Sequence, residues 1–392
     1  MDKELIVRVA ARGEGVTADG RFVPLAAPGD HLGADGELAW GPHHQAPPCR
    51  HFPECGGCQL QHLDDESYAD FVRDRIVSAL GAQGLAVPDI APVHVSPPNS
   101  RRRASLSAQR IGRRLLLGFK QERSHRIEDM QECHVLEPEL FALVAPLRVL
   151  LGALMPDRGT ATVKLTLADQ GVDLLLEGVA ADSLPAVEAL SAFAEHHALA
   201  RLSLDDGLGP QTRWEPAPVT ITLGGTAVSL THDAFLQATA DGEAALVAAV
   251  RESVGQAGST ADLFSGLGTF ALNLHGKVYA AEASRDAVLA LKTAARGTFA
   301  DHRDLYRRPL ATAELNRFEA VILDPPRAGA EAQVRALAGS TVPRIAYVSC
   351  NPASFARDAR LLVSGGYRLA RIWPVGQFRW STHVELAAAF VR

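Results

Sequence analysis

The sequence predicts an α/β fold with an open, mostly parallel sheet in its C-terminal half, and three observations support this prediction. Strand and helix patterns alternate from residue 262 to residue 392, as in sheets joined by right-handed crossovers. Two short apolar runs, residues 320–323 and 345–348, have the composition of buried parallel strands. A glycine turn at residues 265–271 follows another strand pattern and leads toward a helix, as in nucleotide-binding sheets.

Length and composition bound the class of protein. A chain of 392 residues predicts two or three domains, and a hydrophobic content of 47% is enough for sizeable cores. No apolar stretch reaches the roughly 18 residues that a membrane-spanning helix needs. The first residues lack the basic-then-apolar pattern of a signal peptide. We therefore expect a cytoplasmic protein without a membrane partner, and we expect a monomer.

The first element is a short β segment. Residues 1–45 are rich in glycine and contain apolar alternations at residues 6–9 and 21–24. These patterns predict short strands, and the segment has the character of a fragment of a small β-barrel. A proline-rich stretch at residues 42–48 then marks a domain boundary.

The cysteines indicate a metal centre in the next segment. Four of the five cysteines could share one centre: Cys49, Cys55, Cys58 and Cys133. The first three form a C-x5-C-x2-C pattern in a loop rich in proline and glycine, where Gly56 and Gly57 could point amide groups at cluster sulfurs. Because disulfides are rare in the cytosol, four thiolates indicate tetrahedral zinc or an iron–sulfur cluster. Spacing alone favours zinc slightly.

The central region, to about residue 216, predicts mostly strands, with helices at residues 64–80, 140–154 and 184–196. Between residues 101 and 126, eight arginines and one lysine stand against one acid, a local charge of +8 in a chain of net charge −6. Such a basic stripe can engage phosphates although the whole protein is acidic. We predict RNA contact here, first by Arg101, Arg102 and Arg103. The alternative is a solvated surface hairpin.

The C-terminal domain, from residue 217, predicts a cofactor site. It begins with a hairpin pattern around Gly224-Gly225. In the turn that follows, Gly266 and Gly268 let the backbone approach a ligand closely. The next strand ends at Glu282, whose carboxylate can accept hydrogen bonds from ribose hydroxyls. Asp262, just before the turn, would repel a pyrophosphate and attract an ammonium, so the pattern favours S-adenosylmethionine over a nicotinamide dinucleotide.

The two apolar strands end in Asp324-Pro325-Pro326-Arg327 and in Ser349-Cys350-Asn351-Pro352. Parallel strands present functional groups at their carboxyl ends, where ligands bind. The prolines force the chain to leave the sheet abruptly. We therefore predict covalent catalysis by Cys350 beside Asp324. The alternative is that Cys350 is one more buried cysteine.

Together these motifs resemble the RNA uracil-5-methyltransferase family, and most closely its iron–sulfur members, which modify 23S ribosomal RNA. The matching segments are residues 235–237, 262–268, 324–329, 349–352 and 383–385, together with the distant cysteine pattern. The resemblance implies a class I, Rossmann-like methyltransferase domain over residues 217–392. It also implies a β-rich central domain over residues 46–216, with a [4Fe–4S] cluster rather than zinc, and a reduced TRAM-like, OB-like segment over residues 1–45.

The resemblance also implies residue roles. Cys350 would add to carbon 6 of uracil, Asp324 would hold the uracil edge, and Glu385 would remove the carbon 5 proton after methyl transfer. Phe235 would stack on the extruded base, and Gln237 with Asp324 would distinguish uracil from cytosine. The residues implied for S-adenosylmethionine are Gln237, Phe264, Gly266, Gly268, Thr269, Glu282, Asp304 (with Asp301 as a rival) and Asp324.

The chain departs from the family pattern in two places. Residues 378–383 read Phe-Arg-Trp-Ser-Thr-His where the family has Phe-Pro-His-Thr-Gly-His, and Thr239 stands where the family has Asn. The implied activity is S-adenosylmethionine-dependent methylation of uracil carbon 5 in structured RNA, with 23S ribosomal RNA as the first candidate. The alternatives are the same reaction on transfer RNA, and a cluster-containing RNA-binding protein whose methyltransferase domain is inactive.

Overall fold

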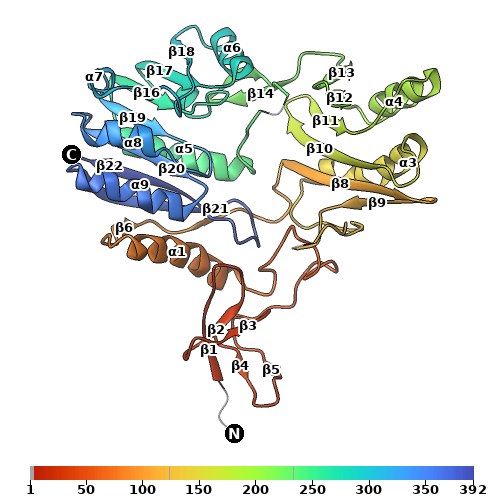
Figure 1. Cartoon of the computed structure of the whole chain (residues 1–392), viewed down its shortest axis with the longest axis horizontal. Coiled ribbons are helices and arrows are strands. Elements are labelled where there is room, and N and C mark those ends of the chain that lie inside the picture. Colours follow the sequence, from red (N-terminus) through yellow and green to blue (C-terminus); the bar gives the residue numbers. More distant parts are fainter. Residues whose placement is uncertain (1–3, 123, 233) are drawn as a thin grey trace.

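The computed structural model describes residues 4–122, 124–232 and 234–392, and it places them in three bodies (Figure 1). A large sheet covered by helices forms one body, and a second sheet with its own helices lies beside it. A small sheet near the N-terminus projects below both. Strand β6 and helix α1 lie along the lower side of the large body, on the side that faces the small sheet (Figure 1).

The N-terminal body is a five-stranded sheet in the order β3-β2-β1-β4-β5. Its strands are β1 (Glu4–Val9), β2 (Gly15–Thr17), β3 (Phe22–Val23), β4 (His31–Leu32) and β5 (Leu38–Ala39). A small core of Ile6, Val23, Ala26 and Leu32 holds it together. The short strands predicted for residues 6–9 and 21–24 are therefore confirmed.

The central body is a six-stranded sheet in the order β13-β12-β11-β10-β8-β9. Its strands are β8 (Arg103–Ile111), β9 (Arg114–Gly118), β10 (Thr160–Ala168), β11 (Gly171–Glu177), β12 (Arg201–Asp205) and β13 (Gln211–Trp214). The helices are α2 (Pro138–Ala142), α3 (Val144–Leu154) and α4 (Leu184–His196), close to the predicted ranges. One apolar core joins these helices to the inward-facing residues of β8, β10 and β11.

The C-terminal body is a nine-stranded sheet in the order β18-β17-β16-β19-β20-β22-β21-β6, with β7 also pairing with β21. Its strands from this part of the chain are β16 (Ser259–Leu263), β17 (Lys277–Glu282), β18 (Thr298–His302), β19 (Ala320–Leu323), β20 (Arg344–Ser349), β21 (Arg368–Gly376) and β22 (Glu385–Val391). Strands β16 to β20 pair in parallel, as predicted, and β22 is antiparallel to both neighbours.

Helices cover both faces of this sheet. On one face, α5 (Ala240–Val254) and α6 (Arg285–Ala294) pack against alternate strand residues. On the other face lie α8 (Glu331–Ala338), α9 (Pro352–Ser364) and α1 (Asp65–Ala82). The short elements are α7 (Thr312–Leu315) and the 3-10 turn η1 (Ala271–Asn273). Because both faces are covered, β19 and β20 are buried along nearly their whole length, which explains their continuous apolar sequences.

The structure places residues 65–95 with the C-terminal sheet, whereas the sequence boundaries put them in the central domain. Helix α1 buries Tyr68, Phe71 and Ile76 in the same core as α8 and α9. Strands β6 (Asp89–Ile90) and β7 (His94–Val95) then pair in parallel with β21. The sequence alone could not predict this placement, because the apolar face of α1 would be equally suited to packing against either sheet.

The predicted hairpin at Gly224-Gly225 is confirmed. Strands β14 (Thr220–Leu223) and β15 (Thr226–Ser229) pair antiparallel around a two-residue turn. Both glycines have positive φ, of 56° and 78°, as a tight hairpin of this kind requires.

Candidate active site

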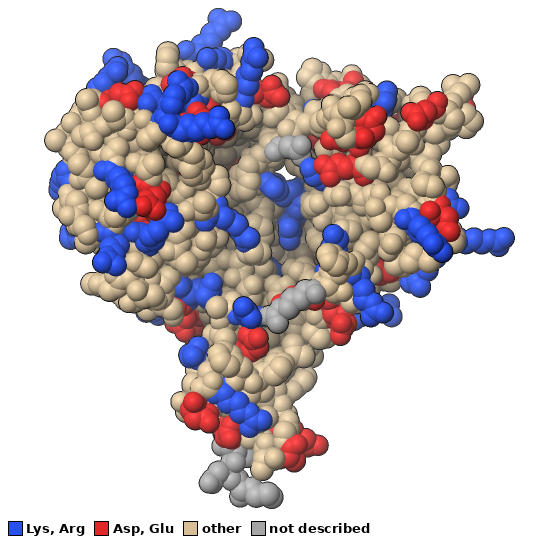
Figure 2. Space-filling model, in the orientation of Figure 1, with Lys and Arg blue, Asp and Glu red and all other residues tan. Residues whose placement is uncertain are grey.

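A cavity of about 850 Å³ lies where the three bodies meet, at the carboxyl ends of the parallel strands. Its wall combines distant parts of the chain: Arg12 from the N-terminal body, Gly57 from the cysteine loop, Phe119 from the central body, and many residues after 235. Figure 2 shows a hollow between the two large bodies with Lys and Arg side chains along it. A site of this size and position can hold a cofactor together with a base.

Cys350 and Glu385 lie across from each other at this end of the sheet. Ser349 at the end of β20 pairs with Leu386 of β22, so Cys350 and Glu385 are the next pair in the same register. Asp324 follows β19, on the other side of β20, and its N–H donates to the carbonyl of Leu263 over 3.2 Å. All three predicted catalytic side chains line the cavity.

The buried acids at the site have pKa values above the ordinary carboxyl range. Burial raises the pKa of Asp324 to about 8, and the carboxylates of Glu385 and Glu282 add to this shift. Burial also raises the pKa of Glu385 to about 7. The pKa of the Cys350 thiol is raised by burial and then by Glu385 and Asp324. A cavity surrounded by acids of this kind favours a positively charged ligand.

Asp262 is a further buried acid, but it lies beneath the glycine turn and is not among the residues that line the cavity. Its Oδ2 accepts the N–H of Ala271 over 2.9 Å, and its Oδ1 has no hydrogen-bond partner among the described residues. Burial, followed by the charge of Asp324, raises its pKa to about 7. The predicted attraction of a ligand ammonium by Asp262 therefore finds no place on the cavity wall, and the carboxyl instead holds the turn from beneath.

The glycine turn bends sharply toward the cavity. Phe264 and Gly266 have positive φ, of 65° and 54°, and both line the cavity. The N–H of Gly266 donates to Glu282 Oε2 over 3.0 Å, and the N–H of Ser284 donates to Glu282 Oε1 over 2.7 Å. A carboxylate has lone pairs beyond these two bonds, so Glu282 can still accept from a ligand hydroxyl.

Gly268, also predicted to bind cofactor, has a different role. It is not among the residues that line the cavity. Its φ of 96° lies in the left-handed region that favours glycine, and a Cβ at this position would also come within 2.7 Å of the end of the Leu291 side chain. Thr269, the next residue, does line the cavity, as predicted.

An aromatic pair closes one side of the cavity. The rings of Phe264 and Tyr306 have centroids 5.6 Å apart, and the Tyr306 hydroxyl donates to the carbonyl of Gly329 over 3.0 Å. Asp304 lines the cavity and accepts the N–H of Tyr306 over 3.0 Å. Its rival Asp301 accepts the Tyr279 hydroxyl and is not on the cavity wall. Tyr306 was not predicted from the sequence, although it lies only two residues after the predicted Asp304.

Phe235 is an exposed aromatic ring at the mouth of the cavity. It is 56% exposed, which is unusual for a phenylalanine, and it lines the cavity. The guanidinium of Arg103 lies 5.0 Å from the ring centroid, and it also donates to the carbonyl of Leu236 over 2.6 Å. The ring is therefore held in place while one side stays accessible for stacking.

The neighbouring Arg101, Arg102 and Arg103 are more buried, and make more contacts within the protein, than the basic stripe predicted. Arg102 is buried, pairs with Glu243 at 2.6 Å and donates to the carbonyl of Gln237 over 3.0 Å. Arg101 is half-buried and lies over the rings of Phe119 and Phe378 at 5.7 and 5.5 Å. These side chains hold the cavity wall, and Arg102 has no surface left for a phosphate. Arg123, another member of the stripe, lies outside the described residues.

Glu385 and Gln237 share one partner, Gln377, which the sequence analysis did not single out. The Nε2 of Gln377 donates to Glu385 Oε2, and it donates to Gln237 Oε1 over 2.7 Å. The ring of His383, two residues before Glu385, contacts the guanidinium of Arg327. A buried glutamine directly after a strand end offers no distinctive sequence signal.

The four cysteines of the predicted metal centre line one small cavity beside the active site. Its apolar wall includes Phe52, Met130 and Val135, and it shares Gly57 and Phe119 with the larger cavity. Burial raises the pKa of the Cys58 thiol to about 12 and of the Cys55 thiol to about 11, although the N–H of Gly57 opposes the shift at Cys55. Thiolates in such a place need a bound cation to be stable.

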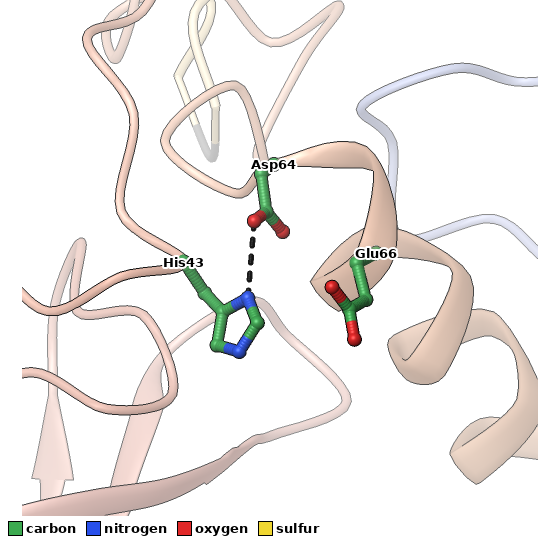
Figure 3. A group of neighbouring side chains, drawn as sticks. All are labelled: His43, Asp64 and Glu66. Atoms are coloured by element: carbon green, nitrogen blue, oxygen red, sulfur yellow. Dashed lines mark hydrogen bonds and ion pairs between the residues drawn. The ribbon is translucent and has the colours of Figure 1, made fainter.

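A second set of ligand-type side chains lies at the start of α1 (Figure 3). Among the described residues, the group of His, Cys, Asp or Glu ligand atoms found within 4.8 Å of one another is His43, Asp64 and Glu66. Asp64 is already used: it caps α1 by accepting the N–H of Ser67 over 2.8 Å, and it contacts His43 Nδ1 at 3.0 Å. This arrangement is explained as a helix N-cap.

Comparisons with known proteins agree with the site. Residues 297–392 match the family model described as tRNA (Uracil-5-)-methyltransferase. An uncharacterized RNA methyltransferase of Zymomonas mobilis is 51% identical over 99% of this chain and 99% of its own. A 23S rRNA (uracil(1939)-C(5))-methyltransferase of Chromohalobacter salexigens is 34% identical over 97% of this chain and 87% of its own.

A solved structure is similar over the same length. The tRNA (uracil-54, C5)-methyltransferase of Pyrococcus abyssi, in complex with S-adenosyl-L-homocysteine, has a TM-score of 0.76 at 22% identity and covers 99% of both chains. At that identity the likeness establishes the α/β methyltransferase fold. In the described part of the chain, every helix is too short or too polar to cross a membrane.

Proposed function

The chain belongs to the RNA uracil-5-methyltransferase family, and on that premise we propose that it methylates carbon 5 of a uridine in 23S ribosomal RNA, with Cys350 as covalent nucleophile. Family membership makes it an S-adenosylmethionine-dependent enzyme acting on RNA. The 34% identity to a 23S rRNA enzyme, over nearly the whole chain, favours ribosomal over transfer RNA. The observation behind the mechanism is that Cys350, directly after β20, and Glu385, at the start of the neighbouring β22, line the same cavity.

The covalent step answers a chemical need, because carbon 5 of uracil is a poor nucleophile. The Cys350 thiolate adds to carbon 6 and forms a C–S bond, and the electrons of the 5,6 double bond move toward the oxygen on carbon 4. The resulting enolate is nucleophilic at carbon 5. S-adenosylmethionine supplies the methyl group, which its positively charged sulfur makes electrophilic.

Glu385 completes the reaction. Once carbon 5 bears both methyl and hydrogen, the Glu385 carboxylate removes the proton, the 5,6 double bond re-forms, and the C–S bond to Cys350 breaks. A base with a pKa of about 7 is well matched to this task near neutral pH. Arg327 lowers the pKa of Cys350, and a cationic ligand in the cavity would lower it further.

The cofactor fits the part of the cavity below the turn. Glu282 faces the position of ribose hydroxyls, Phe264 and Tyr306 offer aromatic faces for an adenine ring, and Asp304 offers an acceptor for its edge. Gly266 and Thr269 complete this wall. Asp324, when ionised, favours the positive charge that the cofactor brings.

The cysteine cavity fits a [4Fe–4S] cluster better than zinc. Sulfurs around one zinc at about 2.3 Å would lie about 3.8 Å from each other. Among the described residues, no three of these sulfurs lie within 4.8 Å of one another, since the group found at that spacing is the histidine group at the start of α1. Irons at separate corners of a cluster suit that wider spread. The proposed ligands are Cys49, Cys55, Cys58 and Cys133.

RNA would enter from the hollow between the bodies. Phe235 offers a stacking face for the extruded base, and Arg12 brings the N-terminal, OB-like body to the same cavity. Arg101 and Arg103 lie beside this proposed route, where their guanidinium groups hold the rings of Phe119 and Phe235 in place. One chain supplies every part of this site, which agrees with a monomer. The proposed substrate is cytoplasmic RNA.

The test is to map 5-methyluridine by mass spectrometry in ribosomal and transfer RNA from a strain that lacks the gene. Restoration by the intact gene, but not by the Cys350→Ala variant, would complete the case. Loss of one 5-methyluridine from 23S ribosomal RNA is the expected result. Loss from transfer RNA alone would replace the proposed substrate, and no change in either would refute the activity in the cell.

A further inference from the structure

Gln377 is fully enclosed between the base-binding segment and the proposed catalytic base. It is 1% exposed and follows the end of β21. Its Oε1 accepts the N–H of Ala238 over 2.8 Å, and its Nε2 reaches both Gln237 and Glu385. Both ends of its amide are therefore in use.

The orientation of this amide is fixed by the backbone. The N–H of Ala238 can only donate, so the atom of Gln377 that faces it must be the oxygen. The N–H of Thr239, at 3.4 Å from the same oxygen, favours the same choice. The NH2 end of Gln377 must then point the other way, where its two hydrogens meet Glu385 and Gln237.

The orientation of the Gln377 amide also determines the orientation of the Gln237 amide. Because Gln377 offers only N–H groups on that side, the Gln237 atom 2.7 Å away must be its Oε1. The Nε2 of Gln237 is thereby left for the cavity, which Gln237 lines, and no hydrogen bond within the described residues uses that nitrogen. Gln237 thus presents a donor, and not an acceptor, to whatever base enters.

We propose that Gln377 is a positioning residue for base specificity, because it fixes Gln237 as a donor toward the oxygen on carbon 4 of uracil. This inference rests on the proposed function. Cytosine carries an amino group at carbon 4, and two donors facing each other in a buried site leave both unpaired. The same Gln237 donor also stabilises the negative charge that develops on the uracil oxygen when Cys350 adds.

Gln377 also holds the proposed base. Its N–H bond to Glu385 lowers the pKa of that carboxyl, against the dominant effect of burial. The charged groups that face Glu385 from neighbouring elements are Arg103 from β8, Arg327 and Asp324 beyond β19, and the Cys350 thiol beyond β20. Removal of the Gln377 donor should therefore raise the pKa of Glu385, so the acidic limb of the pH profile of turnover, where the base takes up its proton, should move to higher pH.

The fold reserves space for this side chain. A Cβ on Gly242, in the first turn of α5, would lie 2.7 Å from the Cβ of Gln377. Thr239 caps that helix by accepting the N–H of Gly242 over 3.0 Å. The first turn of α5 therefore packs directly against the side chain of Gln377. Gln377 is thus packed as tightly as it is hydrogen-bonded.

The experiment uses two matched transcripts, one with 5-fluorouridine and one with 5-fluorocytidine. Fluorine cannot leave as a proton does, so each base that is methylated traps the full-length protein covalently. Wild-type protein should be trapped by 5-fluorouridine RNA. For Gln377→Met, the preference for 5-fluorouridine over 5-fluorocytidine should fall by about tenfold or more, since a relaxed Gln237 can turn its oxygen toward an amino group.

The matched control is Gln333→Met, which removes another buried glutamine that bonds backbone groups of Leu310 far from the cavity. It should keep the wild-type preference. If Gln377→Met fails to fold, Gln377→Glu keeps an oxygen for Ala238 and removes both donors, and the same loss is expected. Wild-type preference and an unshifted pH profile in the Gln377 variants would overturn the inference. Absence of trapping by wild-type protein would instead refute the covalent mechanism.

Discussion

The backbone N–H of Gln59 donates to the carbonyl oxygen of Trp380 over 2.8 Å. Leu60 donates to the same oxygen at the same distance, and the Gln59 side chain accepts the N–H of Thr382 over 3.4 Å. Trp380 packs against Cys58, with a φ of 59° that few non-glycine residues adopt. The cysteine loop therefore holds the segment that leads directly to Glu385.

The first prediction concerns this link. Cys55→Ala should yield protein without the brown colour of an iron–sulfur cluster after anaerobic purification. Hydrogen exchange should speed up both in the cysteine loop and in residues 378–384, because the loop that holds them is no longer tied by a metal centre. Wild-type protein is the reference. Colourless wild-type protein with one bound zinc would contradict the cluster, and unchanged exchange in residues 378–384 would contradict the link.

The second prediction concerns the nucleophile. Cys350→Ala should abolish methylation and lose all covalent trapping by 5-fluorouridine RNA, because no thiol remains to add to carbon 6. Binding of S-adenosylmethionine, measured by calorimetry, should stay close to that of wild type. Measurable turnover by Cys350→Ala would refute its role.

The third prediction separates proton removal from methyl transfer. Glu385→Gln keeps the shape of the side chain and removes the base, so methyl should still transfer while release fails. A covalent protein–RNA adduct should accumulate on ordinary uridine RNA, visible as a shifted band on a denaturing gel. Normal turnover would mean that another group takes the proton.

The fourth prediction concerns pH. Asp324 and Glu385 have pKa values of about 8 and about 7, far above the ordinary carboxyl value of about 4. From about pH 4 up to about pH 7 for Glu385 and about pH 8 for Asp324, the carboxyl is ionised in the unfolded chain and protonated in the folded chain. The free energy of unfolding without ligand should therefore fall as pH rises, by up to about 1.4 kcal/mol per pH unit for each group.

Cofactor binding should change in the opposite direction over the upper part of that window. As the acids lose their protons, their charge attracts the sulfonium, so the dissociation constant for S-adenosylmethionine should decrease with rising pH. S-adenosylhomocysteine lacks that charge and is the control, with a smaller change expected. Equal pH dependence for the two ligands would contradict the electrostatic account.

The fifth prediction concerns Arg102. Arg102→Ala leaves Glu243 buried without its partner and should lower the free energy of unfolding by about 3–5 kcal/mol in urea titrations. Arg113, exposed at the tip of the β8–β9 hairpin, is the comparison: Arg113→Ala should change stability by about 0.5 kcal/mol or less. If the hairpin contacts RNA, the salt dependence of binding should decrease for Arg113→Ala by about 0.7–0.9 in log–log slope. Equal stability of the two variants would contradict the structural role of Arg102.

Sequence reasoning found the groups that sit at strand ends. Asp324, Cys350 and Glu282 follow apolar runs, and the geometry of a parallel sheet brings such ends to one edge. It could not find Gln377 or the true role of Arg102, because both act through contacts between segments more than a hundred residues apart. The local charge predicted Arg102 to be a surface cation, whereas in the structure it is buried and paired with Glu243. Gly268 shows the same limit, since a glycine needed for the backbone of the turn looks like one needed for a ligand.

The pairing of β6 with β21 has a consequence for how the protein is made. Asp89 lies opposite Arg371 at the edge of the large sheet, so this edge can form only once both segments have been synthesised. Until then, the apolar side of α1, which carries Tyr68, Phe71 and Ile76, lacks the core that buries it in the folded protein. We therefore expect the large sheet to be completed late in folding, because its edge depends on a contact between segments far apart in the chain.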